Sequence, residues 1–227
     1  NRETQKFEWK HNPNAKPIYN FPHFDNKHME GSFIIYEHPQ TDNNNEVYYN
    51  RYVAGIDSYD FDESTTDSLG SMFIGDLWTK RIVAEYTGRP RAFDFYETCR
   101  RGLLYYNAMA NIENANKGIF TYFEDRNSYH LIADKLRVEK ETSPETSTTN
   151  SRPKGFTPTP LMNARARGLL AQYLTEKTGN LEKPEELRVH KFRCLPAVKE
   201  MSLWNIDGNF DRVSALGALM LIMYERE

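Results

Sequence analysis

The chain has 227 residues, of which 39% are hydrophobic, 27% charged and 13% aromatic. This length and composition predict one globular domain with a substantial core, and they argue against a disordered chain. No run approaches the roughly 18 apolar residues that a membrane helix needs, and residues 1–10 are too polar for a secretion signal, so we expect a soluble protein that does not contact a membrane.

Charge and cysteine content give two further expectations. The formal net charge of −3 does not by itself indicate DNA binding, because Lys and Arg side chains supply the affinity for phosphates. Residues 152–193 nevertheless contain nine Lys and Arg against four Asp and Glu, so this segment is basic. The two cysteines, Cys99 and Cys194, lie far apart and lack zinc-ligand spacing, which favours a reducing cytosol.

The N-terminal half predicts a linker followed by alternating strands and helices. We expect residues 1–30 to form a linker or extension, residues 31–227 to form the single domain, and the apolar burst at 32–36 to belong to a peripheral β-hairpin. The next predicted elements are strands at 52–56, 71–77 and 82–86, a helix at 94–107, a strand at 109–112, a helix at 117–126 and a strand at 129–133. This order predicts an α/β fold.

The C-terminal half is predicted to be mainly helical. Residues 139–157 are charged and rich in Ser, Thr and Pro, which is typical of a flexible loop. A helix is expected at 159–177 and a strand at 187–192. The last helix is expected to start near Asp211, with Val213, Leu216, Met220 and Met223 on one face.

Acidic residues at the ends of two predicted strands are candidate metal ligands. Asp57 directly follows the apolar run at 52–56, and Glu113 directly follows the strand at 109–112. A carboxylate in such a place is partly desolvated, which is costly unless it is paired or bound to a metal. Hydrolysis of a phosphodiester by two metal ions needs carboxylates from separate elements that converge on one point. The nearby acids Asp60, Asp62, Glu63 and Asp67 are interpreted as solvated turn residues.

The third acid is expected at the start of the last helix. Asp211 is the candidate, although Asp is also favoured at this position simply as a helix N-cap. Asp207 lies four residues earlier and is a possible third or fourth ligand. The sequence leaves the choice between them open.

Several phrases of the sequence together resemble the nuclease domain of tailed-phage terminase large subunits. They are YVAGID at 52–57, RIVAEYTGRP at 81–90, YYNA at 105–108, IEN at 112–114 with Gly118, and FDRVSAL at 210–216. The resemblance covers about residues 30–227. It implies an RNase H-like fold, namely a mixed five-stranded sheet with helices on both faces, and it implies that Asp57, Glu113 and Asp211 bind two Mg²⁺ or Mn²⁺ ions. A water molecule would then be the nucleophile.

The resemblance also implies a biological setting. Members of the family cut concatemeric viral DNA during genome packaging, in the cytoplasm of the infected bacterial host. Their partners are double-stranded DNA, an ATPase domain in the same subunit, the portal and the small terminase subunit. No phosphate-loop motif occurs here, so we expect this chain to lack the ATPase domain and to be a monomeric nuclease domain. One departure from the family is that Phe210, and not a second acid, precedes Asp211.

Four basic residues are candidates for DNA contacts, and two other functions remain open. Lys154, Arg165 and Arg167 flank a turn and a predicted helix start, and Lys117 lies at a helix start close to Glu113. A Holliday-junction resolvase would use the same chemistry on a different substrate, with Asp57, Glu113, Asp207 and Asp211 as its acids. A non-catalytic module that docks on a portal or capsid is the third interpretation.

Overall fold

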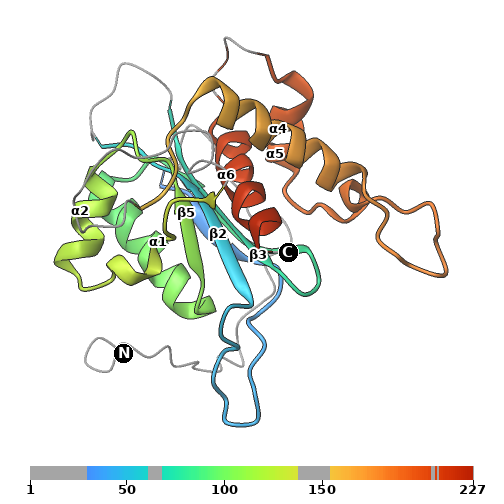
Figure 1. The fold of residues 1–227 in the computed structure, drawn as a ribbon, viewed down its shortest axis with the longest axis horizontal. Coiled ribbons are helices and arrows are strands. Elements are labelled where there is room, and N and C mark those ends of the chain that lie inside the picture. Colours follow the sequence, from blue (N-terminus) through green and yellow to red (C-terminus); the bar gives the residue numbers. More distant parts are fainter. Residues whose placement is uncertain (1–29, 61–67, 138–153, 206–207, 209, 227) are drawn as a thin grey trace.

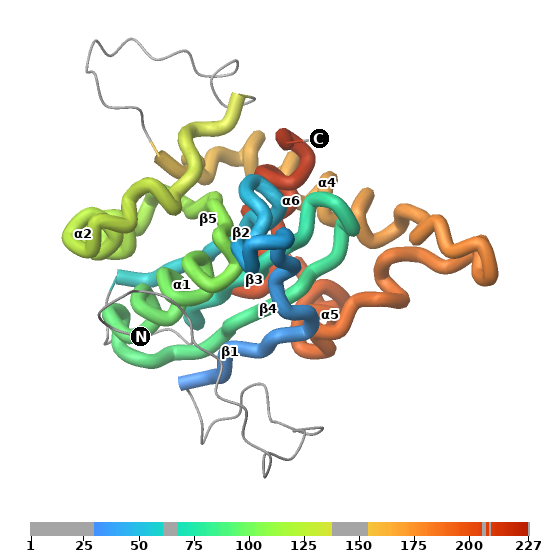
Figure 2. The backbone as a smooth tube through the Cα atoms, turned by 90° about the horizontal axis from the view of Figure 1, so that it is seen from below, coloured from blue at the N-terminus to red at the C-terminus, as the bar shows by residue number. Residues whose placement is uncertain are grey.

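The computed structural model describes residues 30–60, 68–137, 154–205, 208 and 210–226. It is an α/β structure built on a mixed five-stranded sheet with the strand order β1-β4-β3-β2-β5 (Figures 1 and 2). The strands are β1 (Ser32–Ile35), β2 (Tyr52–Asp57), β3 (Gly70–Asp76), β4 (Arg81–Gly88) and β5 (Met109–Ile112). The helices are α1 (Ala92–Tyr106), α2 (Gly118–Asp125), α4 (Pro160–Thr175), α5 (Leu195–Leu203) and α6 (Asp211–Glu225), with 3₁₀ turns η1 (Tyr129–Leu131) and η2 (Arg188–Lys191).

The sheet combines an antiparallel meander with one parallel strand. β2, β3 and β4 follow one another in antiparallel pairs, and β1 adds to the free edge of β4, also antiparallel. β5 pairs with β2 in the parallel sense after the chain has passed through α1. The predicted α/β class and the mixed five-stranded sheet are therefore confirmed.

Three predicted sheet elements were wrong in detail. The segment 32–36, predicted as part of a peripheral hairpin, supplies the edge strand β1; a bridge between Thr41 and Val47 forms a small hairpin beyond it. Residues 129–133 do not form a strand, because Tyr129–Leu131 close a 3₁₀ turn and Ile132 alone bridges to Ala110. Residues 187–192 also fold into a 3₁₀ turn, after one bridge from Leu187.

Alternating residues of β2 divide the core into two layers. Tyr52, Ala54 and Ile56 are buried against α1 and α2 on one face of the sheet. Val53 is buried with α4 and α6 on the other face, where Gly55 meets the backbone of α6. Side chains on a strand alternate between faces, so Asp57 belongs to the face that α6 covers. Helices thus cover both faces, as Figure 1 shows.

The structure confirms the four helices that were predicted along the chain. α1, α2, α4 and α6 lie within two residues of the predicted ranges, and Thr159 caps α4 by accepting a hydrogen bond from the amide of Met162. Helix α5 was not predicted. No helix in the described ranges is long and apolar enough to cross a bilayer.

The predicted loop at 139–157 ends earlier than expected. Residues 138–153 lie outside the described residues, but 154–157 are held against the sheet. Lys154 bridges to Asp134, and Phe156 bridges to Glu113. Between them Gly155 has φ +70° and fits beneath the carbonyl of Ile112, where a Cβ atom would overlap that oxygen. The expectations for residues 1–29 also lie outside the described residues.

Candidate active site

The parallel pairing of β2 with β5 brings Asp57 and Glu113 together. Ile56 is in register with Ile112, so the next residue of each strand is Asp57 on one and Glu113 on the other. Neighbouring strands are about 4.8 Å apart, and residues in register point to the same face. The two carboxylates therefore lie side by side on the face that α6 covers.

Helix α6 adds the third carboxylate because it crosses β2 at a glycine. A Cβ atom on Gly55 would overlap the carbonyl oxygen of Ala215 and the amide of Leu219, so only Gly allows this approach. Ser214, one turn after the start of α6, lies close to Asp57, and its side chain lowers the pKa of that carboxyl. Asp211 lies at that start, on the same side of the sheet.

The side chain of Asp211 does not serve as the N-cap of its own helix, because Phe210 occupies the N-cap position. It accepts a hydrogen bond from the amide of Leu69 at 2.8 Å and one from the hydroxyl of Ser68 at 3.2 Å. These contacts join the start of α6 to the segment that leads into β3. Asp207 lies outside the described residues.

Ionisation of the three carboxyl groups is unfavourable in this place, because all three are at least partly buried. Burial raises the pKa of Asp57 well above its usual range, and the charges of Asp211 and Glu113 raise it further, whereas the hydrogen bond with Ser214 lowers it. Burial also raises the pKa of Glu113. For Asp211 burial raises the pKa, and the hydrogen bonds from Leu69 and Ser68 oppose that rise. Three ionised groups in this place favour a nearby cation.

A fourth acid, Glu200, was missed by the sequence analysis. It lies in α5, and its charge raises the pKa of both Asp57 and Asp211. Its carboxylate accepts hydrogen bonds from the backbone amide of Arg212, at 3.0 Å, and from the Arg212 guanidinium. Glu200 therefore fixes the residue next to Asp211. Because α5 itself was not predicted, no pattern in the sequence pointed to this residue.

Oxygen donors of this kind suit hard divalent cations such as Mg²⁺ and Mn²⁺. In the described part of the chain, no three His, Cys, Asp or Glu side chains are close enough together to hold one ion. Mg²⁺ commonly needs only one or two protein carboxylates, because water and substrate phosphate complete its coordination. Asp57, Glu113 and Asp211 would thus hold such an ion in pairs and not as a set of three.

Asp60 has a structural role and is not a solvated turn residue. Its carboxylate accepts hydrogen bonds from the amides of Lys117 and Gly118 at 2.9 and 3.0 Å, and from the hydroxyl of Tyr96 at 3.0 Å. It thus caps the start of α2 from a distant part of the chain. The other three acids of that turn, Asp62, Glu63 and Asp67, lie outside the described residues.

The four basic residues that were predicted to contact DNA differ in how far their charged groups are exposed to solvent. Lys154 is mostly buried, pairs with Asp134 at 2.9 Å and donates to the carbonyl of Ile132, so its ammonium group already has internal partners. Lys117 is exposed at the start of α2 and lies 5.7 Å from the ring centroid of Phe120. Arg165 is exposed on α4, and Arg167 lies over the ring of Trp204 at 5.0 Å.

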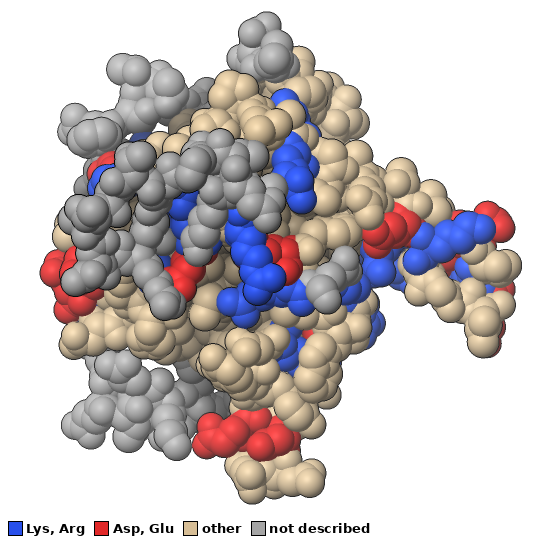
Figure 3. Space-filling model, in the orientation of Figure 1, with Lys and Arg blue, Asp and Glu red and all other residues tan. Residues whose placement is uncertain are grey.

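Arg165 and Arg167 lie in the N-terminal half of α4, at the carboxylate end of the molecule. Helices α4 and α6 run in the same direction, because they meet in the same order along both. Gly217 of α6 contacts Ala166 of α4, and Tyr224, further along α6, donates a hydrogen bond to Glu176 at the end of α4. Figure 3 shows Lys and Arg side chains scattered over the middle of one face with a few acids among them.

No protein-family model matches the chain, and no curated protein matches it.

Proposed function

We propose that this chain is a metal-dependent endonuclease that hydrolyses phosphodiester bonds in double-stranded DNA. The observation that carries the proposal is the convergence of Asp57, Glu113 and Asp211, from β2, β5 and α6, on one edge of the sheet. Acidic side chains that are buried for purely structural reasons are normally paired with Lys or Arg. No ion pair among the described residues involves Asp57 or Glu113.

The strand arrangement supports an RNase H-like assignment. The strand that carries Asp57 lies between an antiparallel neighbour, β3, and a parallel one, β5, with a helix on each face. We propose on this basis, and on the motifs quoted above, that the domain is the nuclease of a phage terminase large subunit. Its substrate would be concatemeric viral DNA in the host cytoplasm, and its partners the ATPase domain, portal and small subunit.

The residues divide the work as follows. Asp57 would hold both ions, with Glu113 completing the ligands of one and Asp211 those of the other. When bound, Mg²⁺ or Mn²⁺ would activate water and stabilise charge on the phosphate. The amide of Leu69 orients Asp211, and Ser214 would help to keep Asp57 ionised. Arg165 and Lys117 would hold the DNA backbone without reading its sequence.

Cleavage of plasmid DNA in Mn²⁺ tests this function. We expect Asp57→Asn, Glu113→Gln and Asp211→Asn each to lower the rate about a hundredfold or more, since a lost ligand costs several kcal/mol and each 1.4 kcal/mol is tenfold in rate. Asp94→Asn, which alters an exposed acid of α1 paired with Arg91, is the matched control and should cut at the normal rate. Full cleavage by Asp57→Asn would favour the docking-module interpretation.

The same assay separates the terminase from the resolvase interpretation. Linear duplex and four-way junctions are offered side by side to the wild-type protein. A terminase nuclease should cut the linear duplex efficiently, whereas a strong preference for symmetric cuts in the junction would favour a resolvase.

A further inference from the structure

A crevice at the other end of the sheet is a second candidate site. It has a volume of about 450 Å³ and lies between the β3–β4 turn, the end of β1 and the segment 178–194. The distance to the carboxylates can be counted along β4. Thr87 is level with Asp57, because both pair with Ser71 of β3, and Arg81 in the crevice lies six residues before Thr87. At about 3.3 Å per residue, the crevice is roughly 20 Å from the carboxylates.

Basic side chains dominate the wall of this crevice. Five basic residues line it, Lys80, Arg81, Arg188, Lys191 and Arg193, whereas its acidic lining consists of Glu37 and Glu186. The carbonyl oxygen of Lys80 accepts a hydrogen bond from Arg188 at 3.1 Å, and Lys191 pairs with Glu186 at 3.1 Å. Five cations stand against three carboxylates, namely Glu37, Glu186 and the Arg188 partner Glu176, so the crevice has an excess of two positive charges and should attract an anion.

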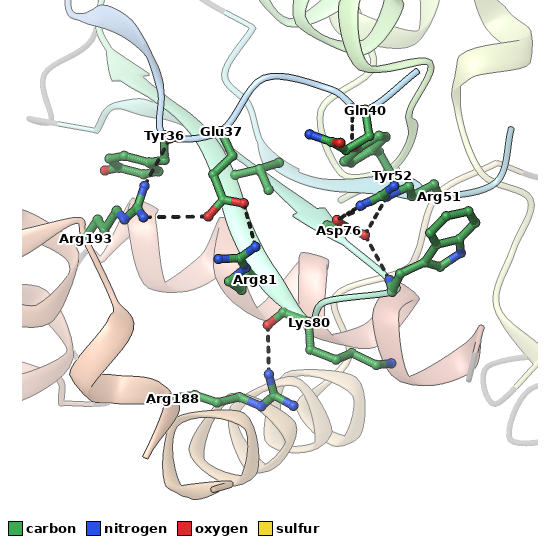
Figure 4. Close-up of polar contacts among 12 residues, drawn as sticks. Tyr36, Glu37, Gln40, Arg51, Tyr52, Asp76, Lys80, Arg81, Arg188 and Arg193 are labelled. Carbon is green, nitrogen blue, oxygen red and sulfur yellow. Dashed lines mark hydrogen bonds and ion pairs between the residues drawn. The ribbon is translucent and has the colours of Figure 1, made fainter. Parts of the chain in front are cut away.

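The guanidinium groups are held in place without being saturated. Arg81 pairs with Glu37 at 3.0 Å and Arg193 with the same carboxylate at 3.6 Å, as Figure 4 shows. Arg193 also donates to the carbonyl of Tyr36, and Arg188 to Glu176. Each guanidinium has five N–H donors, so most donors of these three remain for another acceptor. The side chains of Arg81 and Arg193 are about half exposed.

The remaining lining residues are largely apolar and could pack against an aromatic ring attached to the phosphate. Tyr36, Ile82, Tyr173 and Phe192 add apolar surface to the same wall. Sites for small molecules typically have volumes of about 300–1,000 Å³ and combine apolar walls with a few charged groups. Arginine forks match the paired oxygens of phosphate better than single ammonium groups do.

We propose that this crevice binds a nucleoside phosphate, a di- or triphosphate in its charged form, at a site separate from the three carboxylates. Arg81, Arg193 and Lys191 contact the phosphates, and the aromatic wall takes the base. This binding needs no divalent ion, and it does not depend on the nuclease activity proposed above.

Calorimetric titration in EDTA tests the site. ADP and inorganic pyrophosphate are each titrated into wild-type protein, into the double variant Arg81→Gln/Lys191→Gln and into Lys177→Gln. Lys177 is the matched control, because it is an exposed cation of the same segment, paired with Glu185, that does not line the crevice. Circular dichroism confirms that each variant is folded, and Arg193→Gln replaces the double variant if that protein does not fold.

The wild type and Lys177→Gln should bind ADP with equal affinity, and the double variant should bind it about tenfold or more weakly, which corresponds to one lost charge-assisted contact. ADP should bind more tightly than pyrophosphate, because the base contacts the aromatic wall, and equal binding of the two would overturn the assignment of a nucleoside ligand. Binding should survive Asp57→Asn, which separates this site from the nuclease centre. No binding at millimolar ADP, or equal binding by the double variant, overturns the proposal and leaves the ion pairs as a purely structural clasp.

Discussion

At the scale of single residues, Asp57 sits where its negative charge is unfavourable without a cation. Burial and the charges of Asp211 and Glu113 raise its pKa, so the folded state prefers the protonated form and loses stability as the pH rises through that pKa. Asp57→Asn removes this penalty at neutral pH. In EDTA we expect the variant to unfold at a higher temperature, with a gain of about 0.5–2 kcal/mol.

Thermal unfolding with and without Mn²⁺ checks this expectation. Mn²⁺ should raise the Tm of the wild type and have a much smaller effect on Asp57→Asn, because binding to the folded state stabilises it. Asp94→Asn should behave like the wild type in both conditions. A lower Tm for Asp57→Asn in EDTA, or an undiminished response to Mn²⁺, would contradict the proposed site.

Glu97 gives a prediction of the opposite sign. Burial alone would raise its pKa, but hydrogen bonds from Arg100, Arg101 and Tyr122 lower it to about 2. The folded state therefore prefers the ionised form, and the resulting stability is present above pH 4.5 and lost as the pH falls towards 2. Solvent screens part of these interactions, so Glu97→Gln should cost about 1–2 kcal/mol at pH 7, less than the full pKa shift implies, and progressively less below pH 4.5.

Urea unfolding at several pH values measures this effect. Glu124→Gln, an exposed acid on α2, serves as the reference and should show little pH-dependent change relative to the wild type. A cost for Glu97→Gln that stays constant from pH 7 to pH 3 would show that packing, and not charge, explains the loss.

The positions of some acidic residues could be predicted from the sequence, and the contacts of others could not. Asp57 and Glu113 were predictable, because each follows an apolar strand directly and two parallel strands align their ends. The hydrogen bonds of Asp211 to Ser68 and Leu69 join residues more than 140 positions apart, so no local pattern reveals them. Glu200 was missed for the same reason, since its role depends on how α5 packs against α6.

At the scale of elements, the contact between α6 and β2 positions Asp211 relative to Asp57. A methyl group at Gly55 would collide with the backbone of α6, which cannot move aside as a side chain could. Gly55→Ala should therefore cost about 3 kcal/mol or more and weaken Mn²⁺ binding. The matched substitution is Gly168→Ala in α4, where a Cβ atom meets nothing within 4 Å.

Urea unfolding of the two alanine variants provides the comparison. Gly168→Ala should be neutral or stabilising by up to about 1 kcal/mol, because Ala favours a helix more than Gly does. If Gly55→Ala is as stable as Gly168→Ala and binds Mn²⁺ normally, the crossing of α6 over β2 does not set the geometry of the site.

Elements with strong periodicity were predicted correctly, as were the short strand β5 and helix α2, but three other segments were not. The apolar faces of α1 and α6 and the apolar runs of β2, β3 and β4 gave ranges close to the observed ones. Residues 129–133 and 187–192 have strand-like composition, but each makes only one bridge, so the local 3₁₀ turns prevail. Helix α5 is nine residues long and starts at an unusual cap, the thiol of Cys194, which explains why it was overlooked.

At the scale of the whole molecule, the two proposed sites lie at opposite ends of the strands of the sheet. The carboxylates lie where β2 and β5 end, and the basic crevice lies beside the turn that joins β3 to β4. The acidic and basic groups of these sites are about 20 Å apart, so a chain with a net charge of −3 has local regions of both signs. The net charge of the molecule is therefore a poor guide to its ligand.

The central claim is that Asp57, Glu113 and Asp211 share divalent ions, and anomalous diffraction from crystals soaked in Mn²⁺ tests it most directly. We predict two peaks separated by about 4 Å, with an oxygen of Asp57 bonded to both ions, Glu113 bonded to one and Asp211 to the other. Crystals soaked in Ca²⁺ provide the control for metal selectivity. Peaks elsewhere on the surface, with none bonded to Asp57, would contradict the account.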